Sequence, residues 1–367
     1  METSAATPKT DFSTSLLRWQ RRYGRHDLPW QRQDAYRVWL SEIMLQQTQV
    51  NTVIPYYHNF LQQFPDIEAL ANANIDQVLQ HWQGLGYYAR ARNLYQAARV
   101  IRDQYQGKFP ETMEKVETLP GIGRSTAGAI LSFAFGQNWP ILDGNVKRVL
   151  ARCFQVPGWY GQGETMKQLW RLSTELTPAG NSASFNQGMM DVGSILCLKS
   201  RPKCAACPLT EFCASYRDHT QALYPEKKPK KVRPLRQTLM LLHRFRDQVL
   251  LYRRPPSGIW GGLWSLPEVD DESQIETWQQ GFLSKAQPAK AIQRNLLRHQ
   301  FSHYNLDISL AIIDLEQLPS RIADRDNHAW VNMARLKDYG LPTPVRKLLT
   351  SPQPTKLTVI PAKAGIS

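Results

Sequence analysis

The segment LPGIGRSTAGAI, residues 119–130, most constrains what this chain can fold into. Pro120, Gly121 and Gly123 interrupt one helix and permit a tight turn, and the small residues from Ser125 onward can open a second helix. Two helices joined in this way form a helix-hairpin-helix. Its turn can approach a phosphate closely, and the N–H groups at the start of the second helix attract negative charge. Taken alone, the motif fits an ordinary corner between two helices better than a nucleic-acid site; the other features of the chain shift the interpretation towards binding to a nucleic-acid backbone.

The charge of the chain points the same way. Its 367 residues suffice for two or three domains, and 45 Lys and Arg outnumber 31 Asp and Glu, for a net charge of +14. A polyanion is therefore the expected macromolecular partner. The N-terminus has no apolar signal core, and no run approaches the ~20 apolar residues of a membrane helix. The sequence predicts a cytoplasmic protein, nucleoid-associated if bacterial, with no membrane partner.

The pattern of apolar residues divides the chain into a helical and a mixed half. Apolar residues recur every three or four positions up to about Tyr216, whereas TLMLLHRF, QVLLYRRP and LDISLAII further on are typical of strands. The predicted fold is multidomain, with an all-α domain followed by an α+β domain. The expected ranges are a flexible N-terminus 1–11, a helical domain 12–223, a basic proline-rich linker 224–235, an α+β domain 236–350 and a disordered tail 351–367.

Four cysteines form a compact set at the end of the helical half. Cys197, Cys204, Cys207 and Cys213 have the spacing C-x6-C-x2-C-x5-C, and four thiolates suit iron–sulfur or zinc. The paired knuckles of most structural zinc sites are missing, so one four-iron four-sulfur cluster is favoured. The loop 197–213 also carries three basic residues that can meet phosphates, namely Lys199, Arg201 and Lys203. Cys153 is interpreted as an inert core cysteine.

Two carboxylates are candidates for catalysis. Glu42 lies beside an apolar stripe that predicts a single helix from Trp39 to Pro55, and burial there would raise its pKa enough for a general acid. Asp143 precedes the next helix start, as an N-cap does. Cleaving a base from its sugar needs a proton donor and a negative charge near the cationic sugar. The alternatives are a solvated surface Glu42 and an Asp143 that only caps its helix.

The chain resembles the adenine DNA glycosylases of the MutY type, within the helix-hairpin-helix glycosylase superfamily. The resemblance spans His26 to Leu349 and rests on LPWQ, SEIMLQQTQV, GLGYYARARNL, LPGIGRSTAGAI, ILDGNVKRVLAR, FNQGMMDVG, the four-cysteine run and FSH. It implies that Glu42 is the general acid, that Asp143 stabilises the cationic sugar, and that adenine is flipped out of the duplex before cleavage.

One position separates this family from endonuclease III-like lyases, which carry a lysine after GxGR. Here that position is Ser125, and a hydroxyl cannot form an imine with the sugar. Water is therefore the expected nucleophile, and the product an unbroken strand with an abasic site. Lys147, one helical turn after Asp143, is expected to give only slow, adventitious imine chemistry.

The resemblance also suggests which residues contact the duplex. Tyr87 is a candidate wedge and Gln47 a candidate filler near the opposite base. The residue pattern itself adds Arg90 as a phosphate contact, and Gly121, Gly123 and Ser125 of the hairpin as further DNA-binding residues. Trp30 and Gln187 are expected to line the adenine pocket.

The second half, from about Arg236 to Leu349, resembles a Nudix-like domain that inspects 8-oxoguanine opposite the adenine. Phe301, Ser302 and His303 match the family's lesion-reading loop. The glutamate-rich magnesium helix of Nudix hydrolases is missing from VDDESQIETWQQ, so recognition is expected rather than hydrolysis.

The resulting prediction is a monomeric glycosylase acting on double-stranded DNA with adenine opposite 8-oxoguanine or guanine. Two alternatives stay open. A bifunctional glycosylase/lyase for oxidised pyrimidines is disfavoured by Ser125, and a noncatalytic iron–sulfur DNA-binding protein is disfavoured by the presence of both Glu42 and Asp143. Protein partners are unknown.

Overall fold

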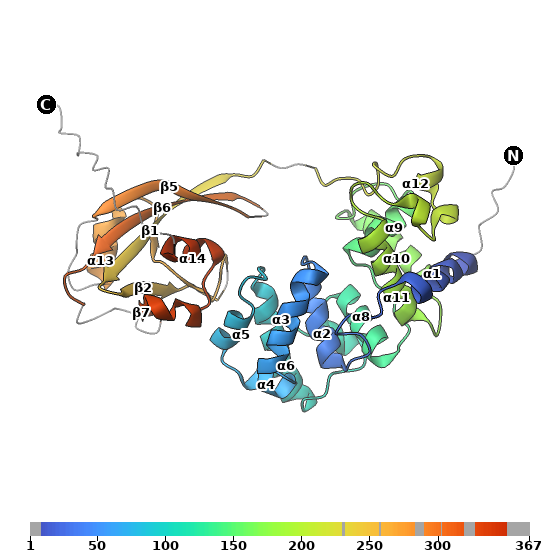
Figure 1. Ribbon diagram of the computed structural model, residues 1–367, viewed down its shortest axis with the longest axis horizontal. Helices are drawn as coiled ribbons and strands as arrows, with labels where there is room; N and C mark the ends of the chain where they lie inside the picture. Colours follow the sequence, from blue (N-terminus) through green and yellow to red (C-terminus); the bar gives the residue numbers. More distant parts are fainter. Residues whose placement is uncertain are drawn as a thin grey trace. The chain divides into compact units, whose positions relative to one another are not determined.

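The structure, a computed structural model, describes residues 9–229, 232–256, 258–282, 290–301, 303–318 and 327–350. The chain forms two compact units, one from residues 1–73 and 90–230 and the other from residues 74–89 and 231–367 (Figure 1). Within the described ranges, no helix combines the length and the apolar composition that crossing a membrane would take.

The first unit is built from helices, which confirms the all-α prediction. Its elements are α1 (Lys9–Tyr23), α2 (Ala35–Leu45), α3 (Val50–Gln63), α4 (Ile67–Asn72), α6 (Ala89–Tyr105), α7 (Met113–Glu117), α8 (Arg124–Phe135), α9 (Gly144–Cys153), α10 (Gly163–Leu176), α11 (Ser182–Asp191), the π-helical turn η1 (Val192–Leu196), the 3-10 turns η2 (Cys204–Ala206) and η3 (Thr210–Phe212), and α12 (Ala214–Arg217). Helix α1 begins at Lys9, within the N-terminal range 1–11 that the sequence analysis set apart.

The prediction of one helix from Trp39 to Pro55 was wrong. Helix α2 ends at Leu45, α3 begins at Val50, and Pro55 lies inside α3. The break occurs because the Arg90 guanidinium donates hydrogen bonds to carbonyl groups at the end of α2. A tertiary contact from a distant helix therefore overrides the local apolar period.

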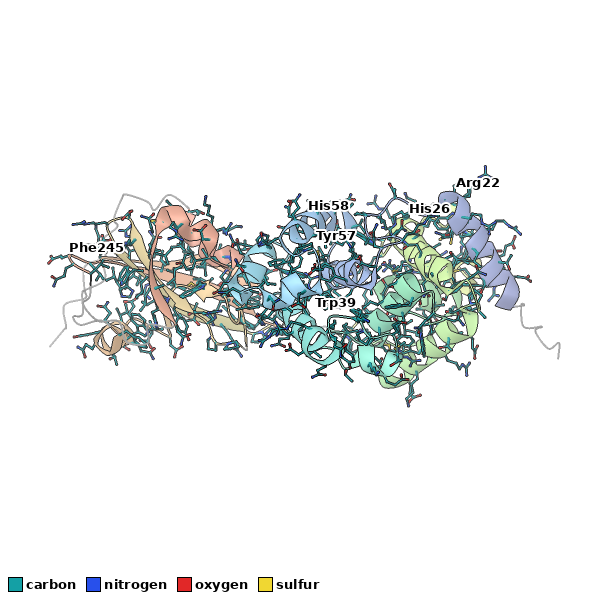
Figure 2. The ribbon with its side chains drawn as sticks, turned by 90° about the horizontal axis from the view of Figure 1, so that it is seen from below. Arg22, His26, Trp39, Tyr57, His58 and Phe245 are labelled. Carbon is teal, nitrogen blue, oxygen red and sulfur yellow. The ribbon has the colours of Figure 1, made fainter. Side chains whose placement is uncertain are left out.

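Buried aromatic rings fill the space between these helices. Trp39 and Tyr57 lie within the helical unit in Figure 2, and neither ring is more than 1% exposed. Trp39 packs at a tilt on Phe109 with ring centroids 5.5 Å apart. Because large rings bury more apolar area than most side chains, they help to hold α2 and α3 in place.

The second unit is centred on one mixed sheet. Its elements are α5 (Ile75–His81), β1 (Leu235–Phe245), β2 (Gln248–Arg253), β3 (Trp264–Ser265), β4 (Glu268–Val269), α13 (Gln274–Phe282), β5 (Ala291–Gln300), β6 (Asn305–Asp314), β7 (His328–Asn332), the 3-10 turn η4 (Met333–Asp338) and α14 (Thr343–Thr350). The strand order is β3-β2-β1-β6-β5, with β4 paired to β1 and β7 to β2. Strands β1 and β6 are parallel, and the other pairs are antiparallel.

The sheet carries apolar side chains on both faces, which confirms the α+β prediction. Leu242, Leu310 and residues of α14 belong to one core cluster, while Leu241, Ala311 and residues of α13 belong to another (Figure 1). Successive residues of β1 and β6 therefore point into different cores. This accounts for the near-continuous apolar runs that the two strands show in the sequence.

Residues 74–89 group with the sheet unit, although the sequence suggested one continuous helical domain over 12–223. Within this unit, Asp76 at the start of α5 pairs with Arg253 of β2 at 3.0 Å. Gln80 Nε2 donates to the Lys337 carbonyl at 3.2 Å, and Gln83 Nε2 donates to the Leu341 carbonyl at 3.2 Å. These contacts join segments about 180 to 260 positions apart, so no local pattern could indicate them.

Candidate active site

Helices α7 and α8 form the hairpin that the sequence predicted. Gly121 adopts a positive φ of 81°, and a Cβ at this position would lie 2.8 Å from the Asn93 Cβ, so a side chain would both strain and crowd the turn. Gly123 is the N-cap of α8 and is exposed, with open space where a Cβ would lie. The turn thus presents the N-terminus of α8 at the surface, as an anion-binding hairpin requires.

A large cavity opens in the same unit, with a volume of about 1290 Å³. A cavity of this size is ample for a nucleobase and its sugar. Six residues singled out from the sequence lie on its wall, namely Trp30, Glu42, Gln47, Ser125, Asp143 and Gln187. The chain therefore brings together residues from α2, α8, α9 and α11 and from the segments between helices.

Glu42 is in a position to hold a proton at neutral pH. It lies on α2 between the buried residues Ser41 and Ile43, and its side chain borders the cavity. Burial raises the pKa of its carboxyl from 4.5 to about 8, and the negative charge of Asp143 adds to the rise. A carboxylic acid with this pKa is largely protonated near neutral pH and can act as a general acid.

Asp143 stands in a different environment, although it borders the same cavity. As N-cap of α9, its Oδ1 accepts hydrogen bonds from the backbone N–H groups of Asn145, at 3.0 Å, and Val146, at 2.8 Å, while Oδ2 accepts from Asn145 Nδ2 at 3.0 Å. Burial raises the pKa of Asp143, but these hydrogen bonds and the charge of Arg148 oppose the rise. The helix start therefore stabilises the carboxylate form.

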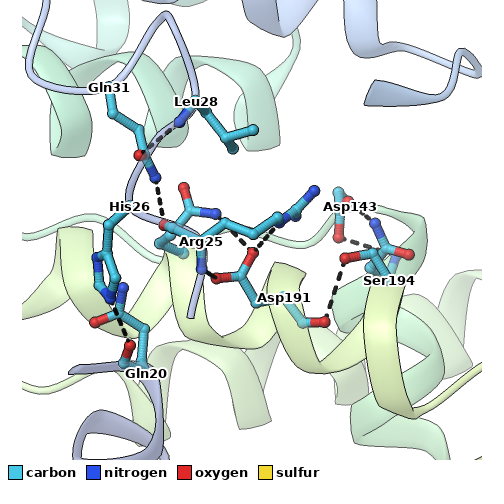
Figure 3. A network of polar contacts seen from close by, with 10 residues as sticks. Gln20, Arg25, His26, Leu28, Gln31, Asp143, Asp191 and Ser194 are labelled. Carbon is cyan, nitrogen blue, oxygen red and sulfur yellow. Dashed lines mark hydrogen bonds and ion pairs between the residues drawn. The ribbon is translucent and has the colours of Figure 1, made fainter. Parts of the chain in front are cut away.

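A polar network that the sequence reasoning missed lies beside the two carboxylates. Asp191 is fully buried, and it accepts from Arg25 Nε at 2.7 Å, Arg25 N at 2.9 Å and Gln187 Nε2 at 2.9 Å (Figure 3). Arg25 and Gln187 both border the cavity. Asp191 thus fixes the orientation of two side chains that can donate hydrogen bonds to a base. The motif FNQGMMDVG contained Asp191, but its partner Arg25 lies 166 positions away.

The segment that leads to Trp30 is held in a compact turn (Figure 3). Gln31 Oε1 accepts from Leu28 N at 3.2 Å, and Gln31 Nε2 donates to the Arg25 carbonyl at 2.8 Å. The Trp30 ring is 6% exposed and meets Tyr57 edge to face, with ring centroids 5.5 Å apart. Trp30 therefore offers a fixed aromatic surface on the cavity wall.

Gln47 and Arg90 have different environments, although the sequence placed both against DNA. Gln47 is exposed at the break between α2 and α3, with a positive φ of 59°. Arg90 is buried, and its guanidinium donates to the carbonyls of Ile43, Met44 and Gln46 and to Thr48 Oγ1. The expected phosphate contact by Arg90 does not fit this geometry, because its charge is committed to the end of α2. Arg90 instead shapes the turn that displays Gln47.

The four predicted metal ligands gather in one place. Cys197, Cys204, Cys207 and Cys213 border a single small pocket of about 20 Å³, together with Cys153. Arg152 Nη1 donates to Cys197 Sγ at 3.3 Å, and Gln221 Nε2 lies 4.0 Å from Cys204 Sγ. Four thiols with donors aimed at two of the sulfurs suit an iron–sulfur cluster, whose thiolates are electron-rich and accept hydrogen bonds. In the part of the chain that the structure describes, no group of three or more His, Cys, Asp or Glu side chains is arranged to hold a metal ion.

Cys153 is buried, as expected, but it is not surrounded by apolar groups alone. Its thiol lies within hydrogen-bonding reach of Cys213, which raises the pKa of Cys153 and lowers that of Cys213 to about 7.

The three basic residues of the cysteine loop, Lys199, Arg201 and Lys203, are all exposed. Lys147 extends over the ring of Tyr160 at 5.6 Å, and it is not among the residues that border the large cavity.

The sheet unit holds the predicted lesion-reading residues and the predicted wedge. Phe301 packs against Trp260 at 5.4 Å, His299 at 4.5 Å and Tyr304 at 4.8 Å between ring centroids, while His303 is exposed. Ser302 lies outside the described residues. Tyr87, also in this unit, is 55% exposed and has a positive φ of 50°. An exposed ring on a constrained backbone can serve as a wedge at low entropic cost.

Family models match both parts of the chain. A model described as an HhH-GPD superfamily base excision DNA repair protein matches residues 40–175, and a NUDIX domain model matches residues 238–351. The NUDIX match lies in the sheet unit. The HhH-GPD match lies mostly in the helical unit and also includes residues 74–89, which group with the sheet unit.

Proteins of known function resemble the chain over most of its length. It is 38% identical over 340 residues to the adenine DNA glycosylase of Buchnera aphidicola subsp. Schizaphis graminum, an alignment that covers 92% of this chain and 97% of that protein. It is 31% identical over 401 residues to the Homo sapiens adenine DNA glycosylase, an alignment that covers 92% of this chain and 73% of that protein.

Solved structures resemble the helical part. A thermostable thymine-DNA glycosylase is 28% identical with a TM-score of 0.51, and the match covers 57% of this chain and 97% of that one. Endonuclease III in a non-covalent DNA complex also has a TM-score of 0.51, at 19% identity, and covers 59% of this chain and 100% of its own. The second match shows a shared fold.

Proposed function

Since the chain belongs to the adenine DNA glycosylase family, whose members hydrolyse the N-glycosyl bond of adenine in base excision repair, we propose that Glu42 and Asp143 perform this hydrolysis and that the preferred partner base is 8-oxoguanine. The observation that carries the proposal is one cavity bordered by both carboxyl groups, of which Glu42 has a pKa raised to about 8 and Asp143 accepts three hydrogen bonds at the start of α9.

Glu42 supplies the proton for the leaving base. Adenine is a poor leaving group as an anion, and protonation of a ring nitrogen weakens the bond to the sugar. The pKa of about 8 keeps the acid form of Glu42 abundant at neutral pH. Arg25 and Gln187, both oriented by Asp191, bind the flipped base, and Trp30 covers one of its faces.

Asp143 stabilises the positive charge that develops on the sugar as the bond breaks. Its carboxylate is fixed by three hydrogen bonds from the first turn of α9, so it requires little reorganisation when the charge appears. Water then adds to the sugar, with Glu42 or Asp143 accepting its proton. Because the position of a lyase lysine is Ser125, the strand stays intact and the product is an abasic site.

Recognition of the duplex combines several exposed groups. The hairpin at Gly121 and Gly123 binds a phosphate, and the basic loop of Lys199, Arg201 and Lys203 adds positive charge. Tyr87 and Gln47 occupy the stack, and the loop that contains Phe301, Ser302 and His303 reads the opposite base. The protein acts as a monomer in the cytoplasm, without a membrane partner.

A four-iron four-sulfur cluster is the resident cofactor of the cysteine loop in this proposal. Cys197, Cys204, Cys207 and Cys213 would hold it, and Arg152 would donate to one of its sulfur ligands. When bound, the cluster provides a rigid centre around which the loop 197–213 folds. The chain's own residues in that loop then present their positive charges to DNA.

A single-turnover assay tests the function. Purified protein is incubated with a duplex that contains adenine opposite 8-oxoguanine, with cytosine in place of adenine as the control, and strands are analysed with and without alkali. We expect strand breakage only after alkali treatment. Breakage without alkali would support a glycosylase/lyase, and the absence of base loss in an iron-replete preparation would support a DNA-binding protein without activity.

The role of the Nudix domain is tested with the opposite base. The Phe301→Ala variant should lose most of the preference for 8-oxoguanine over guanine, while its rate opposite guanine changes little. An unchanged ratio of the two rates would place lesion reading elsewhere in the molecule.

A further inference from the structure

An extended segment, residues 139–142, leads directly into Asp143 and forms neither helix nor strand. Side chains from three helices bind its backbone. The Trp139 carbonyl accepts hydrogen bonds from Ser132 Oγ at 3.0 Å and Asn186 Nδ2 at 2.9 Å. The Ile141 carbonyl accepts from Ser173 Oγ at 2.6 Å. Buried backbone groups outside regular structure need such partners, and here each partner also fixes the path of the chain.

The last of these contacts lies next to the catalytic carboxylate. Ser125 Oγ accepts a hydrogen bond from the Leu142 N–H at 2.9 Å, one residue before Asp143. Ser125 is the second residue of α8, whose N-cap is Gly123 in the hairpin turn. One hydrogen bond therefore connects the helix that follows the hairpin to the backbone that carries Asp143.

We propose that Ser125 is a positioning residue for Asp143: its hydroxyl oxygen holds the Leu142 N–H and so fixes the Asp143 carboxylate at the start of α9, facing the cavity. This inference rests on the proposed function. In this view Ser125 does more than replace an imine-forming lysine. A lysine ammonium has only hydrogen-bond donors and could not accept a hydrogen bond from the Leu142 N–H, whereas the serine hydroxyl can.

Close packing between α8 and the segment supports this role. A Cβ at Gly128, one turn further along α8, would lie 2.5 Å from the Pro140 carbonyl oxygen, so α8 and the segment are in direct contact. The segment has little space in which to shift while Ser125 holds it. Loss of the hydroxyl would leave the Leu142 N–H without its acceptor beside the cavity, where water can bind it and draw the backbone away.

The test uses four forms of the full-length, iron-loaded protein: wild type, Ser125→Ala, Ser125→Thr and Ser13→Ala. Threonine keeps the accepting hydroxyl. Ser13 is a matched control, since its buried Oγ donates one hydrogen bond, to the Leu176 carbonyl at 2.6 Å, far along the chain from Asp143. Single-turnover rates on adenine opposite 8-oxoguanine are measured from pH 5 to 9, together with the melting temperature and the affinity for a duplex whose adenosine resists cleavage.

We expect Ser125→Ala to lower the single-turnover rate about fivefold to tenfold, the effect of losing one hydrogen bond in the transition state, with DNA affinity almost unchanged. The acidic limb of its pH profile should move to higher pH, because an Asp143 less well held by the α9 N–H groups is easier to protonate. Ser125→Thr should restore both the wild-type rate and the wild-type position of the acidic limb of the pH profile. Ser13→Ala should lower only the melting temperature.

An acidic limb that does not move in Ser125→Ala, or a Ser125→Thr variant as slow as Ser125→Ala, would overturn the inference. If Ser125→Ala does not fold, Ser125→Cys decides the question, since a thiol of similar size is a weak acceptor and should give the same shift of the limb. A wild-type protein that releases no adenine would instead reject the proposed function itself, so the two failures are distinguishable.

Discussion

The helical unit and the sheet unit both bury titratable side chains, but Glu42 and Asp143 of the helical unit differ from His243 of the sheet unit in their access to a ligand. Glu42 and Asp143 border a cavity of about 1290 Å³. In the sheet unit, His243 of β1 is fully buried, its ring stacks on Trp278 with centroids 5.3 Å apart, and neither ring nitrogen finds a hydrogen-bond partner among the described residues. Burial shifts the pKa in both units, yet it becomes useful for catalysis only where a substrate can reach the group.

The largest expected effect tests the acid of the helical unit. Glu42→Gln keeps the size of the side chain and removes the proton donor, so we expect a loss of about 10³-fold in the single-turnover rate. Affinity for uncleaved duplex should be retained, because Glu42 is not among the predicted phosphate contacts. A variant that releases adenine at the wild-type rate would show that the raised pKa of Glu42 has no catalytic use.

Asp143→Asn tests the second carboxylate separately from its capping role. Asparagine caps helices about as well as aspartate, so α9 and the melting temperature should be preserved while the rate falls about 10²-fold. The pKa of Glu42 should also fall, since the charge of Asp143 contributes to its rise. The basic limb of the remaining activity should then lie below that of the wild type. Full activity in this variant would show that Asp143 caps α9 and has no catalytic role.

Removal of the proposed cluster should affect the helical unit and leave the sheet unit unchanged. Iron-depleted protein, or Cys204→Ser, should lose the visible absorbance of the cluster, and amide hydrogen exchange should accelerate around the cysteine loop 197–213. Exchange in strands β1 and β6 should stay at the wild-type level. Faster exchange throughout the sheet unit would mean that the two units do not respond independently.

The smallest effect concerns stability, and its sign is opposite in the two units. Glu42 has a pKa of about 8 in the folded protein, against an ordinary value of 4.5. Its favourable contribution to the free energy of unfolding is therefore complete below pH 4.5 and is lost as the pH rises through about 8. His243 has a pKa lowered by burial from 6.5 to about 3, so its contribution is complete above pH 6.5 and is lost as the pH falls through about 3.

Hydrogen exchange followed across pH can separate these two contributions. Glu42→Gln should flatten the pH dependence of the helical unit between pH 4.5 and 8, and His243→Phe should flatten that of the sheet unit below pH 6.5. The phenyl ring can keep the stack on Trp278 without a titrating nitrogen. If the stability of a unit depends on pH in its variant as it does in the wild type, other titratable groups dominate the pH dependence of that unit.

Local patterns in the sequence determined much of the fold and of the candidate site. The turn glycines Gly121 and Gly123, the N-cap at Asp143 and the strands β1, β2 and β6 follow from residues within a few positions of one another. Helix starts, tight turns and alternating strands are governed by local sterics and hydrogen bonds, so a sequence displays them directly. The cysteine spacing belongs to the same class.

Only the tertiary structure decided the features that join distant segments. Arg90 ends α2 and buries the charge that the sequence had assigned to DNA, Arg25 meets Asp191 across 166 positions, and Ser125 accepts the Leu142 N–H. A buried charge or backbone group takes whichever partner the packed chain brings within about 3 Å, and no period or motif in the sequence records that partner. The sequence thus determined which residues could perform the chemistry, and the packing of the helices determined which of them face the cavity and which hold it in shape.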